Sequence, residues 1–409
     1  MKILSASWII TCDKNDSIIK DGAIVFDDKI IDVGTKEYIS RKYQDIEIEF
    51  LGENSVLMPG LINSHVHLEF SSNTTTLKYG NFMQWLNSVI ASREELVEKA
   101  TSALISKKLT KMLKSGTTTI GAISSYSFEM QACLSTPINT VFFTEVIGSK
   151  GDMADTLFAD FKARLETAKK NANKSFIPAV AIHSPYSVHP FLVREALTLA
   201  KEENLAVSSH FLESPEEFEW LHKDEGGFLE FFKNFLGQEQ SVTKPMEFLN
   251  QFKNIDNLSF THCVEASDND LEKIKELNGF VNHCVTSNRL LNNTKLNIDK
   301  LIDLKVPFTI GTDGLSSNNS LSMFDELRNC LMIHNHKNPI SFSKQLIHGA
   351  TSNGAKALGL EKGELVKDKD ADIIAITLPD TIKDEEDLYM NIILHTKYTN
   401  KVFIGGNNV

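Results

Sequence analysis

The chain has 409 residues, of which 42% are hydrophobic and 23% are charged. These fractions are typical of globular proteins and exclude disordered, collagen-like and coiled-coil chains. The formal net charge of −12 argues against binding to nucleic acid polymers or anionic membranes, because both need clustered cations. Few side chains are available for bidentate recognition of a carboxylate, because the arginines are only Arg41, Arg93, Arg164, Arg194, Arg289 and Arg328.

The five cysteines are widely spaced along the chain, and no CxxC pair occurs. This pattern is typical of reduced thiols, and it disfavours both a disulfide framework and a cysteine-rich zinc site. The N-terminus lacks the apolar core of a signal peptide, and no run of about 18 apolar residues is present. We therefore expect a cytoplasmic protein that does not associate with membranes.

Both ends of the chain consist of short apolar segments separated by turn residues. In the first 56 residues such segments occur at 7–11, 22–26 and 30–34, and near the C-terminus they occur at 371–376 and 401–406. Short apolar runs bounded by turns predict β-strands. We therefore expect residues 1–56 and 365–409 to form one small β-sandwich domain from both chain ends.

Residues 57–364 lie between these two ends. In this segment, whose first run begins at residue 55, apolar β-branched runs alternate with helical patterns. The eight runs are 55–63, 117–123, 139–148, 176–183, 205–212, 258–264, 279–286 and 306–311. Helical patterns occur at 94–114, 152–170, 190–203, 268–277 and 341–358, with Pro190 in a first turn and Ser341 as a candidate N-cap. Eight βα units predict an α/β fold, the (β/α)8 TIM barrel. A doubly wound sheet is the alternative, but no GxGxxG follows any run.

Histidines cluster at the ends of the predicted strands. Six of the twelve occupy or directly follow such an end, and one aspartate ends the eighth strand; they are His65, His67, His183, His210, His262, His283 and Asp313. The carboxyl ends of barrel strands meet at one rim, which is where active sites of this fold lie. The remaining histidines fall in helical or loop contexts and are expected to be structural or solvated, with His189 at a helix start.

A metal site is the simplest explanation for this pattern. His65 and His67 project from the same face of an extended strand, which is the geometry of a chelate for Zn²⁺ or Fe²⁺. His210 and Asp313 complete a set of three nitrogens and one oxygen, which leaves a coordination position for water. No lysine lies between Lys174 and Lys201 that could bridge two ions at the fourth strand, so one divalent ion is expected.

Two further residues are candidates for acid–base chemistry. Glu213 follows the ligand His210 by three residues and can protonate a substrate nitrogen while activated water attacks the adjacent carbon. The alternative is an acid at a helix N-terminus, since Ser214 follows with cap character. His262 can orient or deprotonate the water, and Asp313 can carry a proton to the leaving group.

Several motifs together resemble the amidohydrolase superfamily, in particular its S-adenosylhomocysteine/5′-methylthioadenosine deaminase and chlorohydrolase branch. They are 58–67 (MPGLINSHVH), 116–119 (GTTT), 183–186 (HSPY), 210–213 (HFLE), 262–264 (HCV) and 312–321 (TDGLSSNNSL). The similarity covers almost the whole chain. It implies that His65, His67, His210 and Asp313 hold one Zn²⁺ or Fe²⁺ and that Glu213, His262 and Asp313 carry out the chemistry.

The resemblance also implies substrate contacts. Nucleoside deaminases of this branch carry a Trp-Leu pair followed nine residues later by a glutamate that holds the ribose hydroxyls, which corresponds here to Trp85 and Glu94. The alternative is a helix in which Trp85 packs in the core and Glu94 is solvated. His183 and His283 resemble substrate contacts at the rim, although Val285 replaces a proline in the motif that contains His283.

Two departures bear on the identity of the substrate. Glu145 stands where adenosylhomocysteine deaminases tend to carry an arginine, and a carboxylate there would repel an amino-acid carboxylate. The insertion at 216–249 resembles that of the aminodeoxyfutalosine deaminases of menaquinone synthesis. Arg289, near the rim, is then a candidate for binding the benzoate carboxylate of such a substrate, with a surface role as the alternative.

Together with the strand-end residues, this resemblance implies a metal-dependent hydrolytic deaminase that acts on the 6-amino group of a modified adenine nucleoside, 6-aminodeoxyfutalosine. The alternatives are deamination of 5′-methylthioadenosine, adenosylhomocysteine or adenosine, and the activity of another amidohydrolase such as a guanine deaminase or chlorohydrolase. A metal-free binding protein on the same barrel is disfavoured by the complete donor set. A homodimer is the commonest symmetric assembly and is the expected one if the chain self-associates.

Overall fold

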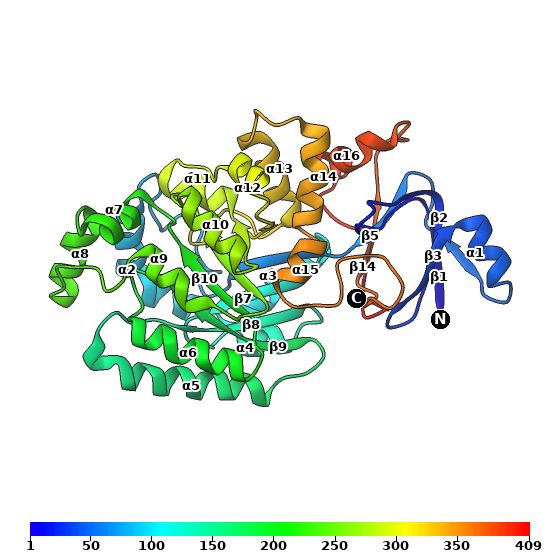
Figure 1. The fold of residues 1–409 in the computed structure, drawn as a ribbon. Helices are drawn as coiled ribbons and strands as arrows, with labels where there is room; N and C mark the ends of the chain where they lie inside the picture. The colour runs from blue at the N-terminus through cyan, green and yellow to red at the C-terminus, as the bar shows by residue number, and fades with distance from the viewer.

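Eight parallel strands form the centre of the protein in the computed structural model, which describes residues 1–409 (Figure 1). They are β6 (Leu61–His67), β7 (Thr117–Ser124), β8 (Asn139–Val146), β9 (Phe176–Ile182), β10 (Val207–Phe211), β11 (Leu258–His262), β12 (Phe280–His283) and β13 (Phe308–Ile310). Each strand pairs with the next along the chain. Ser64 on β6 donates to the carbonyl oxygen of Ile310 on β13 over 2.9 Å, which links the first strand to the last. The predicted TIM barrel is confirmed.

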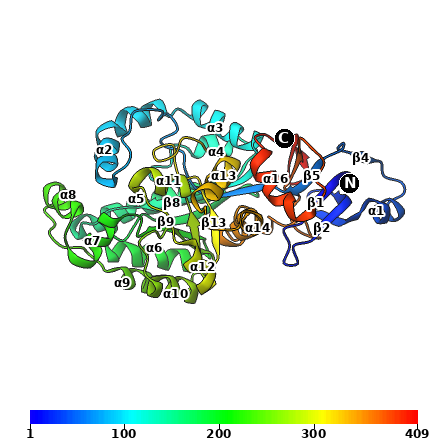
Figure 2. The same cartoon turned by 90° about the horizontal axis from the view of Figure 1, so that it is seen from above.

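Helices surround the barrel strands (Figures 1 and 2). They are α2 (Phe82–Lys99), α3 (Ser102–Lys114), α4 (Met130–Leu134), α5 (Ala154–Lys170), α6 (Pro190–Glu202), α7 (Pro215–Lys223), α8 (Gly227–Leu236), α9 (Pro245–Leu249), α10 (Asp268–Glu276), α11 (Val285–Asn292), α12 (Ile298–Leu304), α13 (Met323–Ile333), α14 (Pro339–Gly349) and α15 (Ser352–Ala357). Both views place α2, α7 and α8 at the end of the molecule farthest from the chain termini. No helix is both long enough and apolar enough to cross a membrane.

A second sheet contains strands from both ends of the chain and forms a separate domain. Its strands are β1 (Lys2–Ile10), β2 (Ile18–Phe26), β3 (Ile30–Thr35), β4 (Ile48–Phe50), β5 (Ser55–Pro59), β14 (Ile373–Thr377), β15 (Lys401–Ile404) and β16 (Asn407–Asn408), accompanied by α1 (Lys36–Lys42) and α16 (Leu388–His395). The order is β16-β15-β14-β5-β1-β2-β3, and β4 pairs with β1. The central strand β5 thus joins the N-terminal strands to the C-terminal ones.

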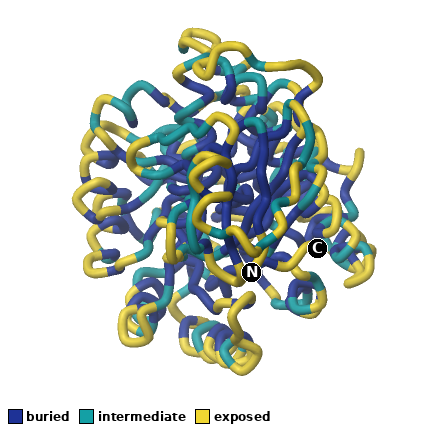
Figure 3. Tube along the Cα trace, turned by 90° about the vertical axis from the view of Figure 1, so that its right-hand side faces the viewer, coloured by how far each residue is buried: buried dark blue, intermediate teal, exposed yellow.

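Burial explains why the barrel strands read as continuous apolar runs. Every residue of β7 and β8 is buried, because helices cover the outer face of these strands and the barrel interior covers the other. Figure 3 shows buried chain at the centre of the molecule and exposed chain on the outer turns. The rim of the barrel is therefore the place where polar side chains at strand ends can meet solvent.

The first predicted strand, 55–63, is in fact two strands that meet at Gly60. β5 belongs to the terminal sheet and β6 to the barrel. The Gly60 amide donates to the carbonyl oxygen of Asp372 over 3.0 Å. A Cβ at Gly60 would collide with the side chain of Thr118, so only glycine fits where the chain passes from one sheet to the other.

Two helix predictions differ from the structure because of local caps. The predicted helix 94–114 is interrupted, and Thr101 caps the second part by accepting a hydrogen bond from the Leu104 amide. The predicted cap at Ser341 is wrong, because Asn338 accepts hydrogen bonds from two amides at the start of α14. The start of α6 is as predicted: Pro190 is in its first turn and His189 is the N-cap residue.

Candidate active site

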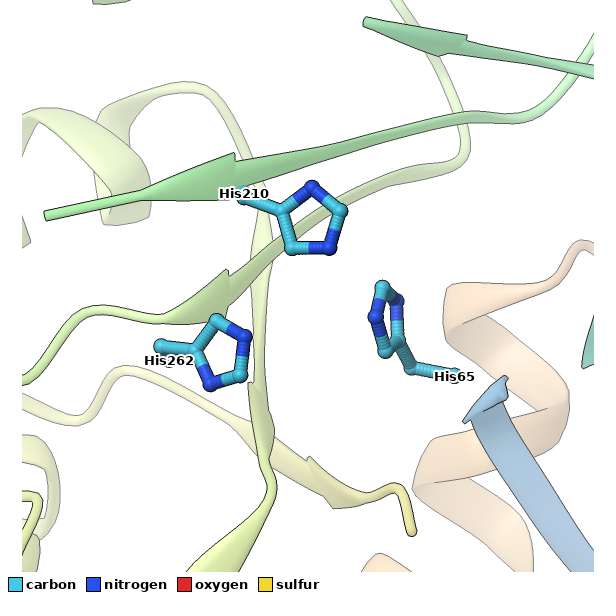
Figure 4. Close-up of side chains that lie close together, drawn as sticks. All are labelled: His65, His210 and His262. Carbon is cyan, nitrogen blue, oxygen red and sulfur yellow. The ribbon is translucent and has the colours of Figure 1, made fainter. Parts of the chain in front are cut away.

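Polar side chains from four strands meet at the carboxyl ends of the barrel. His65 and His67 lie on β6, His210 on β10 and His262 at the end of β11, and Asp313 follows β13. His67 Nε2 is 3.3 Å from His210 Nε2. Asp313 Oδ1 is 3.8 Å from His65 Nε2 and 3.7 Å from His67 Nε2. Figure 4 shows the rings of His65, His210 and His262 around a common centre.

The histidine nitrogens at this centre are suited to a metal ion. His65 Nε2 is buried and has no hydrogen-bond partner. His210 Nδ1 donates to the carbonyl oxygen of His183 over 2.7 Å, so the lone pair of the neutral ring is on Nε2, which faces the cluster. Burial, reinforced by the neighbouring histidines, holds the pKa of both His65 and His210 well below the usual range. Neutral imidazoles of this kind fit Zn²⁺ or Fe²⁺.

Two serines fix the orientation of Asp313. Ser287 Oγ and Ser317 Oγ both donate to Asp313 Oδ2, over 2.8 and 2.6 Å. The other oxygen, Oδ1, therefore faces His65 and His67. Asp313 has φ = 57°, a left-handed conformation that costs a non-glycine residue of the order of 1 kcal/mol and persists only where the surroundings enforce it.

Glu213 and His262 form an acid–base pair beside the histidine cluster. His262 Nε2 is 3.3 Å from Glu213 Oε1, and its Nδ1 is 2.8 Å from Asn288 Oδ1. The amide oxygen of Asn288 can only accept, so the imidazole proton is on Nδ1 and Nε2 is free to accept. Burial, followed by the charge of Asp313, raises the pKa of Glu213 well above its usual range, whereas burial lowers the pKa of His262. Both shifts favour the neutral forms, a carboxyl that can donate and an imidazole that can accept, as proton transfer to a substrate nitrogen requires.

The loop that carries Glu213 is held by another carboxylate, Glu217. Glu217 is fully buried and accepts hydrogen bonds from the amides of Leu212 (3.1 Å) and Glu213 (2.8 Å). Its own amide donates to Ser214 Oγ, which caps α7. Glu217 was not among the candidate residues predicted from the sequence. The acid four residues beyond Glu213 is the signal that could have identified it.

A cavity of about 340 Å³ opens above this cluster. Its volume is in the range of small-molecule sites. The outer wall is largely apolar and comes from α2 and α8, which contribute Trp85, Leu86, Val89, Ile90, Phe231, Phe232 and Leu236. The α8 insertion after the fifth strand packs against α2 through Phe228 and Phe82, whose ring centroids are 5.8 Å apart. The insertion therefore completes one wall of the pocket.

Comparison with known proteins agrees with this geometry. The profile of the amidohydrolase family matches residues 56–409, which include the whole barrel and the C-terminal strands. The chain belongs to the amidohydrolase family. Members of this family generally bind a divalent metal, in line with the donor set at the strand ends.

Relatives similar to this amidohydrolase over nearly their full length include deaminases. It is 45% identical over 406 residues to the aminodeoxyfutalosine deaminase of a Nitratiruptor species, covering 99% of this chain and 98% of the relative. It is 35% identical to an adenosine deaminase of Helicobacter pylori, covering 100% and 99%. The crystal structure of Helicobacter pylori aminofutalosine deaminase with methylthio-coformycin matches with a TM-score of 0.96 at 34% identity and covers 100% of both chains. The zinc complex of atrazine chlorohydrolase from Arthrobacter aurescens, at 18% identity and a TM-score of 0.81, covers 100% of this chain and 95% of that one and shares the fold.

On α2, the structure separates the two residues expected to contact the nucleoside. Trp85 lines the pocket, and its Nε1 donates to the carbonyl oxygen of Ser316 over 2.8 Å. Glu94 is exposed and does not line the pocket. The helix is unbroken from Phe82 to Lys99, and each residue turns it by about 100°, so position 94 is almost opposite to position 85. Arg93 lines the pocket instead.

Of the other three expected contacts, only one lies in the pocket of this amidohydrolase. His183 lines it, next to His210. His283 is fully buried and lies outside it, with its Nε2 2.9 Å from Nε2 of His334. Arg289 is exposed on α11 and is also absent from the lining.

Two pocket carboxylates were not predicted to contact the substrate, although Glu145 was expected to disfavour an amino-acid carboxylate. Glu145, at the end of β8, is fully buried, and Ser125 Oγ donates to its Oε2 over 2.7 Å, while Oε1 has no partner. Glu69 follows β6, with Oε1 3.8 Å from His67 Nδ1 and Oε2 unpartnered. Both acids stand at or just beyond strand ends, which is the signal that could have singled them out.

Proposed function

We propose that this amidohydrolase is a hydrolytic deaminase that removes the 6-amino group of a modified adenine nucleoside, and that the nucleoside is 6-aminodeoxyfutalosine. The observation that carries the proposal is the pairing of Glu213 with His262, whose Oε1 and Nε2 atoms are 3.3 Å apart beside the three-histidine donor set. The similarity over nearly the full length to the aminodeoxyfutalosine deaminase of the Nitratiruptor species supports this choice of substrate.

The reaction replaces the C6–N bond of the purine with a C6–O bond and releases ammonia. A divalent ion held by His65, His67, His210 and Asp313 would supply activated water as the nucleophile. Glu213 donates its proton to the ring nitrogen N1, which makes C6 more electrophilic. His262 accepts a proton from the attacking water at its free Nε2, and the imidazolium that results stabilises the charge that develops on the oxygen. Asp313 passes the remaining proton of that oxygen to the departing nitrogen, which leaves as ammonia, and His262 returns its proton to Glu213, 3.3 Å away.

Recognition of the ribose is assigned to Glu145 in place of Glu94. Oε1 of Glu145 is buried in the pocket and has no partner, while Ser125 fixes the other oxygen. A carboxylate oxygen in this state can accept hydrogen bonds from a pair of hydroxyls, which would also relieve the cost of leaving it unpaired. His183, in the same pocket wall, contacts the purine or the ribose.

The cellular setting follows from the substrate. We place the enzyme in menaquinone biosynthesis by the futalosine route, with Zn²⁺ or Fe²⁺ as the ion and the cytoplasm as the compartment. All five cysteines are buried and unpaired, which suits a reducing environment. A homodimer is the assembly proposed for it.

A panel of nucleosides distinguishes this function from its rival. Enzyme loaded with Zn²⁺ or with Fe²⁺ is assayed for ammonia release from 6-aminodeoxyfutalosine, adenosine, 5′-methylthioadenosine and adenosylhomocysteine. The proposal requires 6-aminodeoxyfutalosine to have the highest kcat/KM. Adenosine as the best substrate would favour the second candidate, adenosine deamination, to which the Helicobacter pylori relative points. The absence of ammonia from every nucleoside would refute both.

A further inference from the structure

The pocket contains a single cationic side chain other than histidine. Of all the lysines and arginines in the chain, only Arg93 lines it. Arg93 lies on α2 near two aromatic rings, with its guanidinium carbon 4.7 Å from the ring centroid of Tyr126 and 5.8 Å from that of Phe70. Tyr126 is 56% exposed, so this part of the pocket is its solvent end. Two aromatic faces thus hold a planar cation at the mouth of the pocket.

The guanidinium of Arg93 has no partner in the protein. It makes no hydrogen bond, and its Nη2 is buried without one. Other partly buried arginines do have partners: Arg164 bonds to Asp160 and to the carbonyl oxygen of Glu145, although its Nη1 has none, and Arg328 bonds to the carbonyl oxygens of Ile393 and Thr396. A buried donor left unpaired is costly, so a donor of this kind at a ligand site is suited to an acceptor on the ligand.

The acids of the pocket do not satisfy Arg93. Glu69 and Glu145 line the same cavity, and although the charge of Arg93 helps to lower the pKa of Glu69, neither acid forms an ion pair with Arg93. Ser125 and His67 contact these acids instead. The pocket therefore has an acidic inner part and one cationic position near its mouth. A ligand that fits this distribution has hydroxyls or amino groups at one end and an anion at the other.

We propose that Arg93 binds the carboxylate of the substrate and thereby selects carboxylated nucleosides over neutral ones. This inference rests on the proposed function, since 6-aminodeoxyfutalosine carries a benzoate. The aromatic ring of the benzoate would pack on the apolar wall that Phe231 and Leu236 form. The guanidinium of Arg93 would donate two parallel hydrogen bonds to the carboxylate. Arg289, the arginine that the sequence suggested for this role, is exposed on α11 and does not line the pocket.

The test compares Arg93→Gln with wild type on two substrates. For 6-aminodeoxyfutalosine, kcat/KM should fall about 100-fold, because a pocket charge pair is lost. For adenosine, which has no carboxylate, it should change less than about threefold. Arg93→Lys should give an intermediate loss with the carboxylated substrate, since a lysine retains the charge but not the planar fork. Arg289→Gln is the matched control and should behave as wild type with both substrates.

Binding of the reaction products gives a second measurement that is independent of turnover. Calorimetry with futalosine and with inosine should show that Arg93→Gln weakens only the binding of futalosine. Equal losses for both ligands, or unchanged affinity for futalosine, would overturn the inference. Wild-type enzyme that deaminates adenosine but not 6-aminodeoxyfutalosine would instead refute the proposed function, so the two failures are distinguishable.

Discussion

Glu217 offers a direct test of how the site positions its proton donor. Its buried carboxylate accepts the amides of Leu212 and Glu213 at 3.1 and 2.8 Å. Leu212 has φ = 47°, a left-handed conformation that these bonds help to hold. Glu217→Ala removes both acceptors and leaves two amides unsatisfied. Each such group costs about 1–3 kcal/mol, so the free energy of unfolding should fall by about 2–6 kcal/mol. Glu217→Gln keeps one acceptor, so its free energy of unfolding should fall by about half as much.

The kinetic effect of Glu217→Ala should be concentrated in kcat. A shift of about 1 Å in a proton donor can lower the rate about 100-fold, whereas the rest of the pocket still binds the nucleoside. We expect kcat to fall about 100-fold and KM to change less than about threefold. Steady-state kinetics and urea unfolding measure the two effects. Glu219→Gln is a matched control, because this side chain lies on the same helix and forms no hydrogen bond to the loop. Wild-type kcat in Glu217→Ala would refute the positioning role.

Three further predictions concern the ribose, the metal and pH. Glu145→Gln should raise KM for adenosine about tenfold and leave KM for 2′,3′-dideoxyadenosine unchanged. Glu94→Gln is the control and should match wild type. An equal effect of Glu145→Gln on both nucleosides would contradict the ribose assignment. Removing the metal with a chelator should abolish activity. If the free ion had been at 100 times its dissociation constant, the free energy of unfolding should also fall by about 2.7 kcal/mol, as measured by denaturation with and without Zn²⁺. Equal stability of the two forms would contradict a metal site in the folded state. Burial, followed by the charge of Glu69, raises the pKa of Glu129 to about 8. The folded state therefore holds a proton that the unfolded chain releases near pH 4.5, so the free energy of unfolding should fall as pH rises toward 8. Glu129→Gln should weaken this fall in urea titrations at pH 6 and 9. The same dependence of the free energy of unfolding on pH in Glu129→Gln and wild type would disprove this prediction.

The metal cluster was predictable because the barrel topology brings strand ends together. A polar residue at the end of a β-branched run needs no tertiary information to be placed at the rim. His65, His67, His210 and Asp313 could therefore be grouped from sequence, although far apart along the chain. The hydrogen bonds that orient them, such as those from Ser287 to Asp313, depend on side-chain conformations that no spacing specifies.

The substrate contacts were harder to predict because they depend on which side of a helix and which face of a strand points toward the pocket. The nine-residue spacing from Trp85 suggested Glu94, but an unbroken helix turns that position away and presents Arg93. His283 is at a strand end, yet it faces His334 after α13, whereas its neighbour Asn282 bonds to Thr261 and Thr309 of the adjacent strands. Alternation along a strand is visible in sequence, but which alternate faces inward is not.

The crossing at Gly60 has a consequence for the order in which the protein can be completed during synthesis. β5 leads directly into the histidine-bearing β6, yet one of its edges pairs with β14, which leaves the ribosome only after the whole barrel. Until then the Ser55–Pro59 edge has no partner and is open to pairing with other chains. Chains that end before β14 should thus be prone to aggregate. The C-terminal strand β14 pairs last with the edge of β5, a strand that was synthesised early.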